Sequence, residues 1–429
     1  MRVSFELTRK RIAVLALAAV VVPFAVGASG IVPISASSGH WAPFGWFLHW
    51  VMGQTVDRQS LGYSPPDGFD PADPKLVQRV AGHFATGCAP CHGAPGEAQS
   101  PVVLAMTPHP PRLEDQVGEW KDRELFWIGK HGVKYSGMPA WATQKRDDEV
   151  WALVAFLRAY PAMTPEDYGR LALGDGLVPP TDIGPGGQGG TQGVGAPGRA
   201  DVAEAVADCA RCHGYDGRGV GEGPAAGAFP VIAGQSEAYL FETLQAYSIA
   251  ARESGIMQPA AKRYDVPMLR ELARWYANQP VDAPAGETVV AAADPPPTGI
   301  PQQIWPQTSP SASDAPPFAP AVAEDGGAVD GGDPALLALG RGIAERGIPS
   351  RKIASCQSCH GPAGRAQNGV YPYLSGQPAW YLEEHLHLWQ EEKRGGTRYS
   401  HLMHEFAINL TEEQMKAVSA WYASRPLGE

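Results

Sequence analysis

The chain has 429 residues, of which 44% are hydrophobic and 18% are charged, and its formal net charge is −11. The hydrophobic fraction is large enough for buried cores, and the length predicts about two to four domains. The net negative charge argues against nucleic acid as a partner, because phosphate binding needs a basic surface.

The first 36 residues have the composition of a membrane anchor or an export signal. Basic residues at positions 2, 9, 10 and 11 precede an apolar run from Ile12 to Ile34, which is long enough to span a bilayer. A cleaved signal peptide is the alternative, since small residues follow at 27–29. We expect residues 1–36 to be a signal-anchor or transmembrane segment with its basic end in the cytoplasm.

Residues 37–69 form an aromatic segment, with Trp and Phe concentrated between His40 and Trp50. Such residues gather where a chain leaves a membrane, so we expect this segment to lie at the membrane interface. The first globular domain then covers residues 70–163. Its apolar periodicity predicts helices over Lys75–Thr86, Asp122–Lys130 and Asp147–Tyr160.

Two linkers separate the remaining domains. Residues 164–200 form a Gly-rich linker, with ten glycines in 171–200. This composition predicts a flexible coil that lets domain 1 move. Residues 281–333 are rich in Pro, Ala and Gly and hold eight acidic and no basic residues, which is typical of a solvated spacer. Domain 2 covers residues 201–280 and domain 3 covers residues 334–429.

Domains 2 and 3 repeat each other. The segment Phe229-Pro-Val-Ile-Ala-Gly-Gln235 corresponds to Tyr371-Pro-Tyr-Leu-Ser-Gly-Gln377, and Trp-Tyr-Ala occurs near the end of both domains. Domain 1 has neither the Gly-Gln nor the Trp-Tyr-Ala element. It is therefore a different subtype.

All six cysteines belong to one pattern, C-x-x-C-H, which occurs once in each domain. The three copies are Cys88, Cys91 and His92; Cys209, Cys212 and His213; and Cys356, Cys359 and His360. This pattern indicates c-type haem attachment, in which two thiols bind the vinyl groups and the histidine lies under the iron. Zinc sites or redox dithiols are the alternative for a C-x-x-C pair. The sequence predicts three covalently bound haem c groups.

A methionine follows each motif at a similar distance and is the predicted second iron ligand. Met138 lies 46 residues after His92, Met257 lies 44 after His213, and Met403 lies 43 after His360. We expect a loop before the last helix of each domain to carry this methionine. In domain 3, His401 and His404 flank Met403, so ligation by two histidines is an alternative there; otherwise we expect both to face solvent.

Each proximal histidine also needs an acceptor for its Nδ1–H, which fixes its tautomer and orientation. A Pro-x-Leu/Ile element follows every motif, and the carbonyls of Pro111, Pro230 and Pro372 are the predicted acceptors. The alternative is that these prolines only form turns.

Each domain resembles a class I cytochrome c domain, with a helix, C-x-x-C-H, a proline loop, a methionine loop and a final helix. Domains 2 and 3 resemble the two halves of the cytochrome c4 type. Domain 1, with Ser-Gly-Met-Pro-Ala-Trp141 around its methionine, resembles the single-haem modules of membrane-bound cytochromes. The resemblance implies an all-α fold of three tandem cytochrome c domains, His/Met ligation of all three irons, and electron transfer.

An iron with both axial positions filled can only change its oxidation state, so we expect an electron carrier and not an enzyme. The predicted protein is tethered to the inner membrane, faces the periplasm, and passes electrons from a quinol-oxidising complex or dehydrogenase to a terminal oxidase or another acceptor. Secretion to the periplasm after signal cleavage is the alternative location. One alternative function is an electron-accepting subunit of a membrane-bound alcohol or sugar-acid dehydrogenase, since three-haem chains also resemble the cytochrome subunits of such enzymes. The other is a peroxidase-like enzyme, but the three positioned methionines argue against it.

Overall fold

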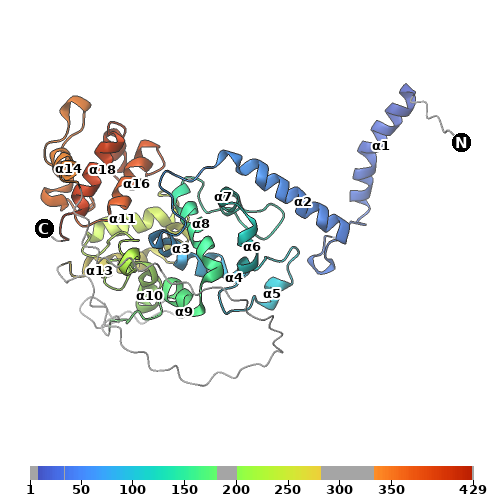
Figure 1. The fold of residues 1–429 in the computed structure, drawn as a ribbon, viewed down its shortest axis with the longest axis horizontal. Coiled ribbons are helices and arrows are strands. Elements are labelled where there is room, and N and C mark those ends of the chain that lie inside the picture. The colour runs from blue at the N-terminus through green and yellow to red at the C-terminus, as the bar shows by residue number, and fades with distance from the viewer. Residues whose placement is uncertain (1–7, 33, 181–200, 282–332, 428–429) are drawn as a thin grey trace, which may run out of the picture.

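The computed structural model describes residues 8–32, 34–180, 201–281 and 333–427 (Figure 1). Within these ranges the regular structure is helical, apart from two isolated bridges, so the all-α prediction is confirmed. Residues 181–200 and 282–332, on which most of the two linker predictions rest, lie outside the described ranges. Helix α1 (Arg9–Ala28) projects away from the body formed by the three domains.

The two N-terminal helices differ in what they contact. No residue of α1 is buried. Among the described residues, α1 is the one helix that is long and apolar enough to cross a membrane. Helix α2 (Ala42–Gln59) exposes Trp46 near its start but buries Val56 near its end. Asp57 then pairs with Lys121 at 3.1 Å and Arg123 at 2.8 Å, at the start of α7 (Asp122–His131). One end of α2 is thus fixed to domain 1.

Domain 1 is built on α3, α7 and α8. Its helices are α3 (Pro74–Gly87), α4 (Ala89–His92), α5 (Pro101–Leu104), α6 (Leu113–Gln116), α7 (Asp122–His131), α8 (Asp147–Ala159) and α9 (Pro165–Tyr168). The three helices predicted from periodicity are confirmed to within one residue at each end. Asp73 caps α3 by accepting from the Lys75 amide at 2.9 Å. Phe84 of α3 then packs on Phe156 of α8, with ring centroids 4.8 Å apart.

The core of domain 1 extends beyond the predicted boundary at residue 163. Tyr168 and Ala172 are buried in this core, and Gln78 of α3 donates to the Leu171 carbonyl at 3.0 Å. The start of the predicted Gly-rich linker, residues 164–173, therefore packs with domain 1. The sequence placed the boundary too early because this extension is short and contains Pro and Gly.

Domains 2 and 3 share one arrangement. Domain 2 has α10 (Val202–His213), α11 (Glu237–Ser248), α12 (Met257–Lys262) and α13 (Val266–Ala277). Domain 3 has α14 (Pro334–Arg346), α15 (Gln357–His360), α16 (Ala379–Gln390), α17 (Ser400–Ala407) and α18 (Glu412–Ala423). In all three domains the first long helix packs against the last one: α3 on α8, α10 on α13, and α14 on α18. In α14, Gly340 lies directly against the Ala417 backbone of α18, where a side chain would not fit.

The repeated Gly-Gln element joins domain 2 to domain 3. Gln235 donates to the Tyr373 carbonyl at 2.8 Å and accepts from the Tyr373 amide at 2.9 Å. Gln377 makes the equivalent pair with Val231, at 2.6 Å and 3.0 Å. Since Val231 and Tyr373 occupy the same place in the repeat, the interface has approximate twofold symmetry. We call these four residues the glutamine clasp.

Domain 1 also packs against both other domains. The Arg79 guanidinium of α3 lies 3.3 Å from the centre of the Trp380 ring of domain 3, and Trp141 of domain 1 contacts Gly255 of domain 2. Buried contacts of this kind oppose the prediction that the Gly-rich segment lets domain 1 move freely. Sequence composition reports on the connecting chain, whereas the position of the domain depends on the surfaces that it buries.

Candidate functional site

The three C-x-x-C-H motifs adopt the same local shape. Each occupies one helical turn, which stands alone as α4 and α15 in domains 1 and 3 and is the last turn of α10 in domain 2. In domains 1 and 3 the histidine amide bonds back to the first cysteine carbonyl, at 2.9 Å for both His92 and His360. This turn brings both cysteines and the histidine close together, because residues three and four apart share a helix face. A glycine with positive φ ends each turn: Gly93 at 81°, Gly214 at 69° and Gly361 at 76°. A residue with a side chain is strained at such a φ.

The predicted acceptors of the proximal histidines are confirmed in two domains. His92 Nδ1 lies 2.9 Å from the Pro111 carbonyl oxygen, and His360 Nδ1 lies 3.0 Å from that of Pro372. These contacts leave Nε2 of each ring available for an iron. In domain 2 the ring of His213 lies beside Pro230, but its Nδ1 makes no hydrogen bond of normal geometry in the described structure.

The candidate ligands of domains 2 and 3 share one cavity of about 710 Å³. Its lining includes Cys209, Cys212, His213 and Met257 from domain 2, and Cys356, Cys359, His360 and Met403 from domain 3. The structure thus brings Met257 and Met403 to the same cavity as the motifs of their own domains. The lining is mostly apolar, as a haem pocket requires.

The candidate ligands of domain 1 do not line that cavity. Cys88 packs against the domain 1 core, and His92 ends α4. Met138 is half-buried in the segment between α7 and α8, where its amide donates to Ser136 Oγ at 3.1 Å. The pairing of His92 with Met138 therefore stays a prediction.

The methionines are not all held by loops. Met138 does lie outside a helix, but Met257 is the first residue of α12 and Met403 lies within α17. Of the histidines beside Met403, His401 is exposed as expected. His404 does not simply face solvent, because its ring is half-buried and its Nδ1 lies 2.7 Å from the Trp389 carbonyl oxygen. Only Met403 of these three lines the cavity.

The cysteines are poor candidates for zinc or dithiol chemistry. Burial raises the pKa of Cys209 to about 12 and that of Cys356 to about 11. Disulfide exchange needs the thiolate, which such burial disfavours. In the described ranges, no group of three or more His, Cys, Asp and Glu is placed to hold a metal ion. A thioether bond to haem needs no thiolate in the finished protein.

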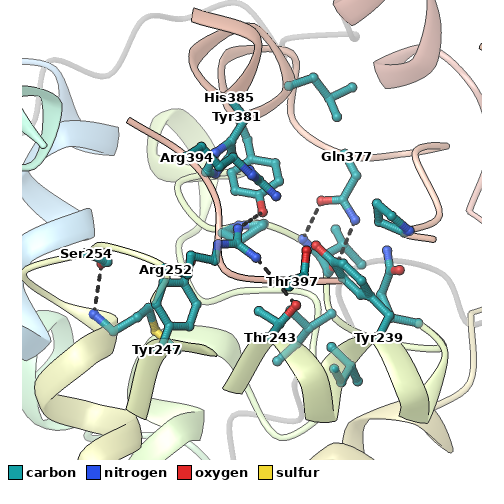
Figure 2. A pocket seen from close by; sticks show the side chains of 18 of the residues that line it. Tyr239, Thr243, Tyr247, Arg252, Ser254, Gln377, Tyr381, His385, Arg394 and Thr397 are labelled. Carbon is teal, nitrogen blue, oxygen red and sulfur yellow. Dashed lines mark hydrogen bonds between the residues drawn. The ribbon is translucent and has the colours of Figure 1, made fainter. Parts of the chain in front are cut away.

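A buried cationic cluster lies in the cavity between domains 2 and 3, and the sequence analysis missed it. Figure 2 shows Arg252 and Arg394 among Tyr239, Thr243, Tyr247, Tyr381 and His385. Arg252 donates to Thr243 Oγ1 and to the Tyr381 hydroxyl, both at 3.4 Å. In both repeats the arginine follows the Gly-Gln element by 17 residues, and this spacing was the signal that could have revealed it.

The cluster fits the acidic edge of a haem. Among the residues that the structure describes, neither Arg252 nor Arg394 has a carboxylate within 4.0 Å, and Nη1 of Arg394 is buried without a hydrogen-bond partner. Burial, together with the charge of Arg252, lowers the pKa of Arg394. Two buried guanidinium groups without counter-ions are costly in free energy. Propionate carboxylates entering the same cavity would remove that cost.

Comparison with known proteins supports this assignment. Residues 75–157 match the family described as "Cytochrome C oxidase, cbb3-type, subunit III", and residues 200–279 and 350–425 match the family described as "Cytochrome c". A thiosulfate dehydrogenase electron acceptor of Thiomonas intermedia (strain K12) is 32% identical over 223 residues, which are 52% of this chain and 80% of that protein.

Two further relatives show the same similarity. A thiosulfate dehydrogenase electron acceptor of Stutzerimonas stutzeri (strain A1501) is 29% identical, over 50% of this chain and 78% of its own length. A cytochrome c4 of Thiocapsa roseopersicina is 26% identical, over 53% of this chain and 92% of its own length. With its cytochrome c domains, its repeated haem-attachment motifs and these relatives, the chain belongs to the multihaem c-type cytochromes, electron carriers with covalently bound haem c.

Proposed function

We propose that the chain is a membrane-tethered periplasmic carrier with three haem c groups, each held by the histidine of its motif and by Met138, Met257 or Met403. The observation that carries this proposal is the shared cavity, where two motifs and two methionines meet. Haem supplies one-electron redox chemistry when bound. When haem is bound, the histidine and the methionine of each site would hold its iron, and Arg252 and Arg394 would compensate the charge of propionates in the shared cavity.

The membrane tether rests on α1 and α2. An 18-residue stretch of α1 has a mean hydropathy of 2.2, and Trp41, Trp46 and Trp50, which follow it, are all exposed. Exposed tryptophans beside an apolar helix are favourable at the membrane interface and unfavourable in water. Since the end of α2 is fixed to domain 1, the tether would hold domain 1 near the membrane surface.

The packed arrangement favours a relay over a moving shuttle. Domains 2 and 3 share a cavity, and domain 1 is docked on both of them. In this proposal electrons pass within one body between a membrane donor and an acceptor such as a terminal oxidase.

The first test counts the haems and assigns their ligands. Intact-mass spectrometry of the full chain should show three haems, and Cys→Ala replacement of both cysteines in one motif should remove one. Redox titration with far-red absorption should then report three His/Met irons. Fewer than three haems, or a high-spin iron in the purified protein, would contradict the proposal.

The names of the relatives favour a second candidate. Two are called thiosulfate dehydrogenase electron acceptors, so this chain could accept electrons from a periplasmic dehydrogenase. Mild-detergent extraction, a native gel stained for haem, and mass spectrometry of the band separate the two candidates. A band shared with a dehydrogenase supports the second. A band shared with an oxidase or a quinol-oxidising complex supports the first.

A further inference from the structure

The loop that leads from α11 to Met257 of domain 2, residues 249–256, is held by domain 1. In this loop Ser254 is only 1% exposed, and its Oγ accepts from the Met257 amide at 3.0 Å. The same hydroxyl donates to the Glu149 carboxylate of α8 at 2.5 Å. One hydroxyl therefore connects a domain 1 carboxylate to the backbone of a predicted iron ligand in domain 2.

Both carboxylate oxygens of Glu149 accept hydrogen bonds from this loop. Its second carboxylate oxygen accepts from the Gly255 amide at 2.6 Å and from the Trp141 indole at 3.1 Å. The side chain is 6% exposed, and Arg146 compensates its charge at 3.1 Å. A buried carboxylate with several donors has a fixed orientation, because rotation would leave donors unpaired.

Neighbouring residues of domain 1 secure the rest of the loop. Lys145 forms an ion pair with Glu253 at 2.8 Å, and Arg146 donates to the Glu253 carbonyl at 3.4 Å. Trp141, which follows the predicted ligand Met138 by three residues, packs against Gly255. The methionine segments of domains 1 and 2 are thus bound directly to each other.

Domain 3 has no such arrangement in the described structure. Two residues after Arg252 comes Ser254, whereas two residues after the equivalent Arg394 comes Gly396. Gly396 contacts the backbone of Ala251, so this part of domain 3 meets the loop of domain 2 that precedes Met257. The carboxylate–serine contact is therefore specific to the domain 2 methionine.

We propose that Glu149 is a positioning residue for the haem iron of domain 2, and that domain 1 sets the properties of that iron by holding Met257 through Ser254. This inference rests on the proposed ligand role of Met257. Without Glu149 the loop would lose its acceptor, and the bond from sulfur to iron would weaken or break. Because methionine ligation raises a haem potential, its loss lowers the potential of that one haem.

The direction of the change separates positioning from simple electrostatics. A carboxylate near an iron stabilises the ferric state by Coulomb attraction, so removing its charge alone would raise the potential. Loss of methionine ligation lowers it instead. In the Glu149→Ala variant of the full chain we expect one of three midpoint potentials to fall, and about one third of the far-red sulfur-to-iron absorption of the ferric protein to disappear.

The matched control is Glu124→Ala. Glu124 is also a buried domain 1 carboxylate, at 5% exposure, but it accepts from Lys121 at the start of its own helix. This variant should keep all three potentials and the full absorption. Glu149→Gln, which keeps one acceptor oxygen, should retain more of the absorption than Glu149→Ala.

Two further variants make each outcome decisive. Met257→Ala tests the ligand assignment alone: if it leaves the absorption intact, the proposed ligand is wrong. If Met257→Ala removes a third of the absorption and Glu149→Ala removes none, the positioning role is overturned while the ligand stands. If Glu149→Ala does not assemble, Ser254→Ala decides, because it deletes the connecting hydroxyl and must also weaken the absorption of one haem.

Discussion

The two interfaces of domain 2 are built on different principles. The interface with domain 3 is the glutamine clasp, in which two neutral side chains bind backbone groups reciprocally. The interface with domain 1 is one-sided and charged, and it centres on Glu149 and its contacts with the Met257 loop. A repeated sequence can supply both halves of an interface, whereas the added domain 1 needs its own set of contacts.

The largest expected effect comes from removing the glutamine clasp. In the double variant Gln235→Ala and Gln377→Ala, the amide and carbonyl groups of Val231 and Tyr373 lose all four bonds. Each unsatisfied buried group costs about 1–3 kcal/mol, so we expect a loss of roughly 4 kcal/mol or more. Urea unfolding and amide exchange at Val231 and Tyr373 measure it.

Gln390→Ala is the matched control for the clasp. Gln390 also donates two bonds to backbone carbonyls, of Ala407 and Leu410, but both lie within domain 3. This variant should destabilise domain 3 and leave exchange at Val231 unchanged. Equal exchange at Val231 in both variants would show that the clasp does not join the domains.

The second prediction concerns how low pH changes the folding stability of domain 1, through a histidine on the side that faces the cavity. Burial lowers the pKa of His83, on α3 against Trp141, to about 4 from about 6.5. The unfolded chain then binds one more proton between these values, so folding stability falls as the pH drops through this window. Between pH 7 and 5 the loss from this group is on the order of 2 kcal/mol.

Urea unfolding of His83→Phe at both pH values measures this contribution. The variant should lose less stability than the parent chain when the pH is lowered. His401→Phe, at an exposed position, should behave like the parent. The prediction fails if His83→Phe and the parent chain lose the same stability between pH 7 and pH 5.

The third prediction distinguishes the haem sites of domains 2 and 3 from that of domain 1. Arg394→Gln removes a buried positive charge beside the shared cavity. Because a positive charge favours the reduced state, the potentials on that cavity should fall by roughly 40 mV, or about 1 kcal/mol for one electron. Potentiometric titration checks this, with the exposed Arg341→Gln as control. A shift of all three potentials would contradict it.

Much of the fold could be predicted from the sequence. The apolar periodicity of Asp147–Ala159 predicted a helix, and the three motifs predicted three haem-attachment turns. Both kinds of feature are local, because they depend on residues that are close in the sequence. The acceptor carbonyls of Pro111 and Pro372 were also predictable, because a proximal histidine always needs one. The sequence shows that Gln235 and Gln377 occupy equivalent positions in the repeat, but it does not show that they join domain 2 to domain 3.

What could not be predicted depends on contacts between distant segments. Glu149 reads as an ordinary acidic residue in the first turn of a helix, and only docking on Ser254 gives it a role. Arg252 and Arg394 could be matched by their equal spacing from the Gly-Gln element, but only the structure shows that both line one cavity. The packing of domain 1 on its neighbours could not be predicted for the same reason: linker composition contains no information about the surfaces that domains bury.

The smallest expected effect lies at the edge of the domain 1 interface. Glu253→Gln removes the ion pair with Lys145, whose side chain is 50% exposed, while that of Glu253 is 26% exposed. Pairs in contact with water contribute about 0.2–1 kcal/mol, so the loss should be at the lower end and vanish in high salt. Glu345→Gln, in the exposed pair with Arg341 within α14, is the control for general charge effects. Urea midpoints at low and high salt, compared between these two variants, isolate the interface contribution. A salt-independent loss as large as that of the clasp variant would mean that the peripheral charges, and not the buried acceptor Glu149, hold domain 1 in place.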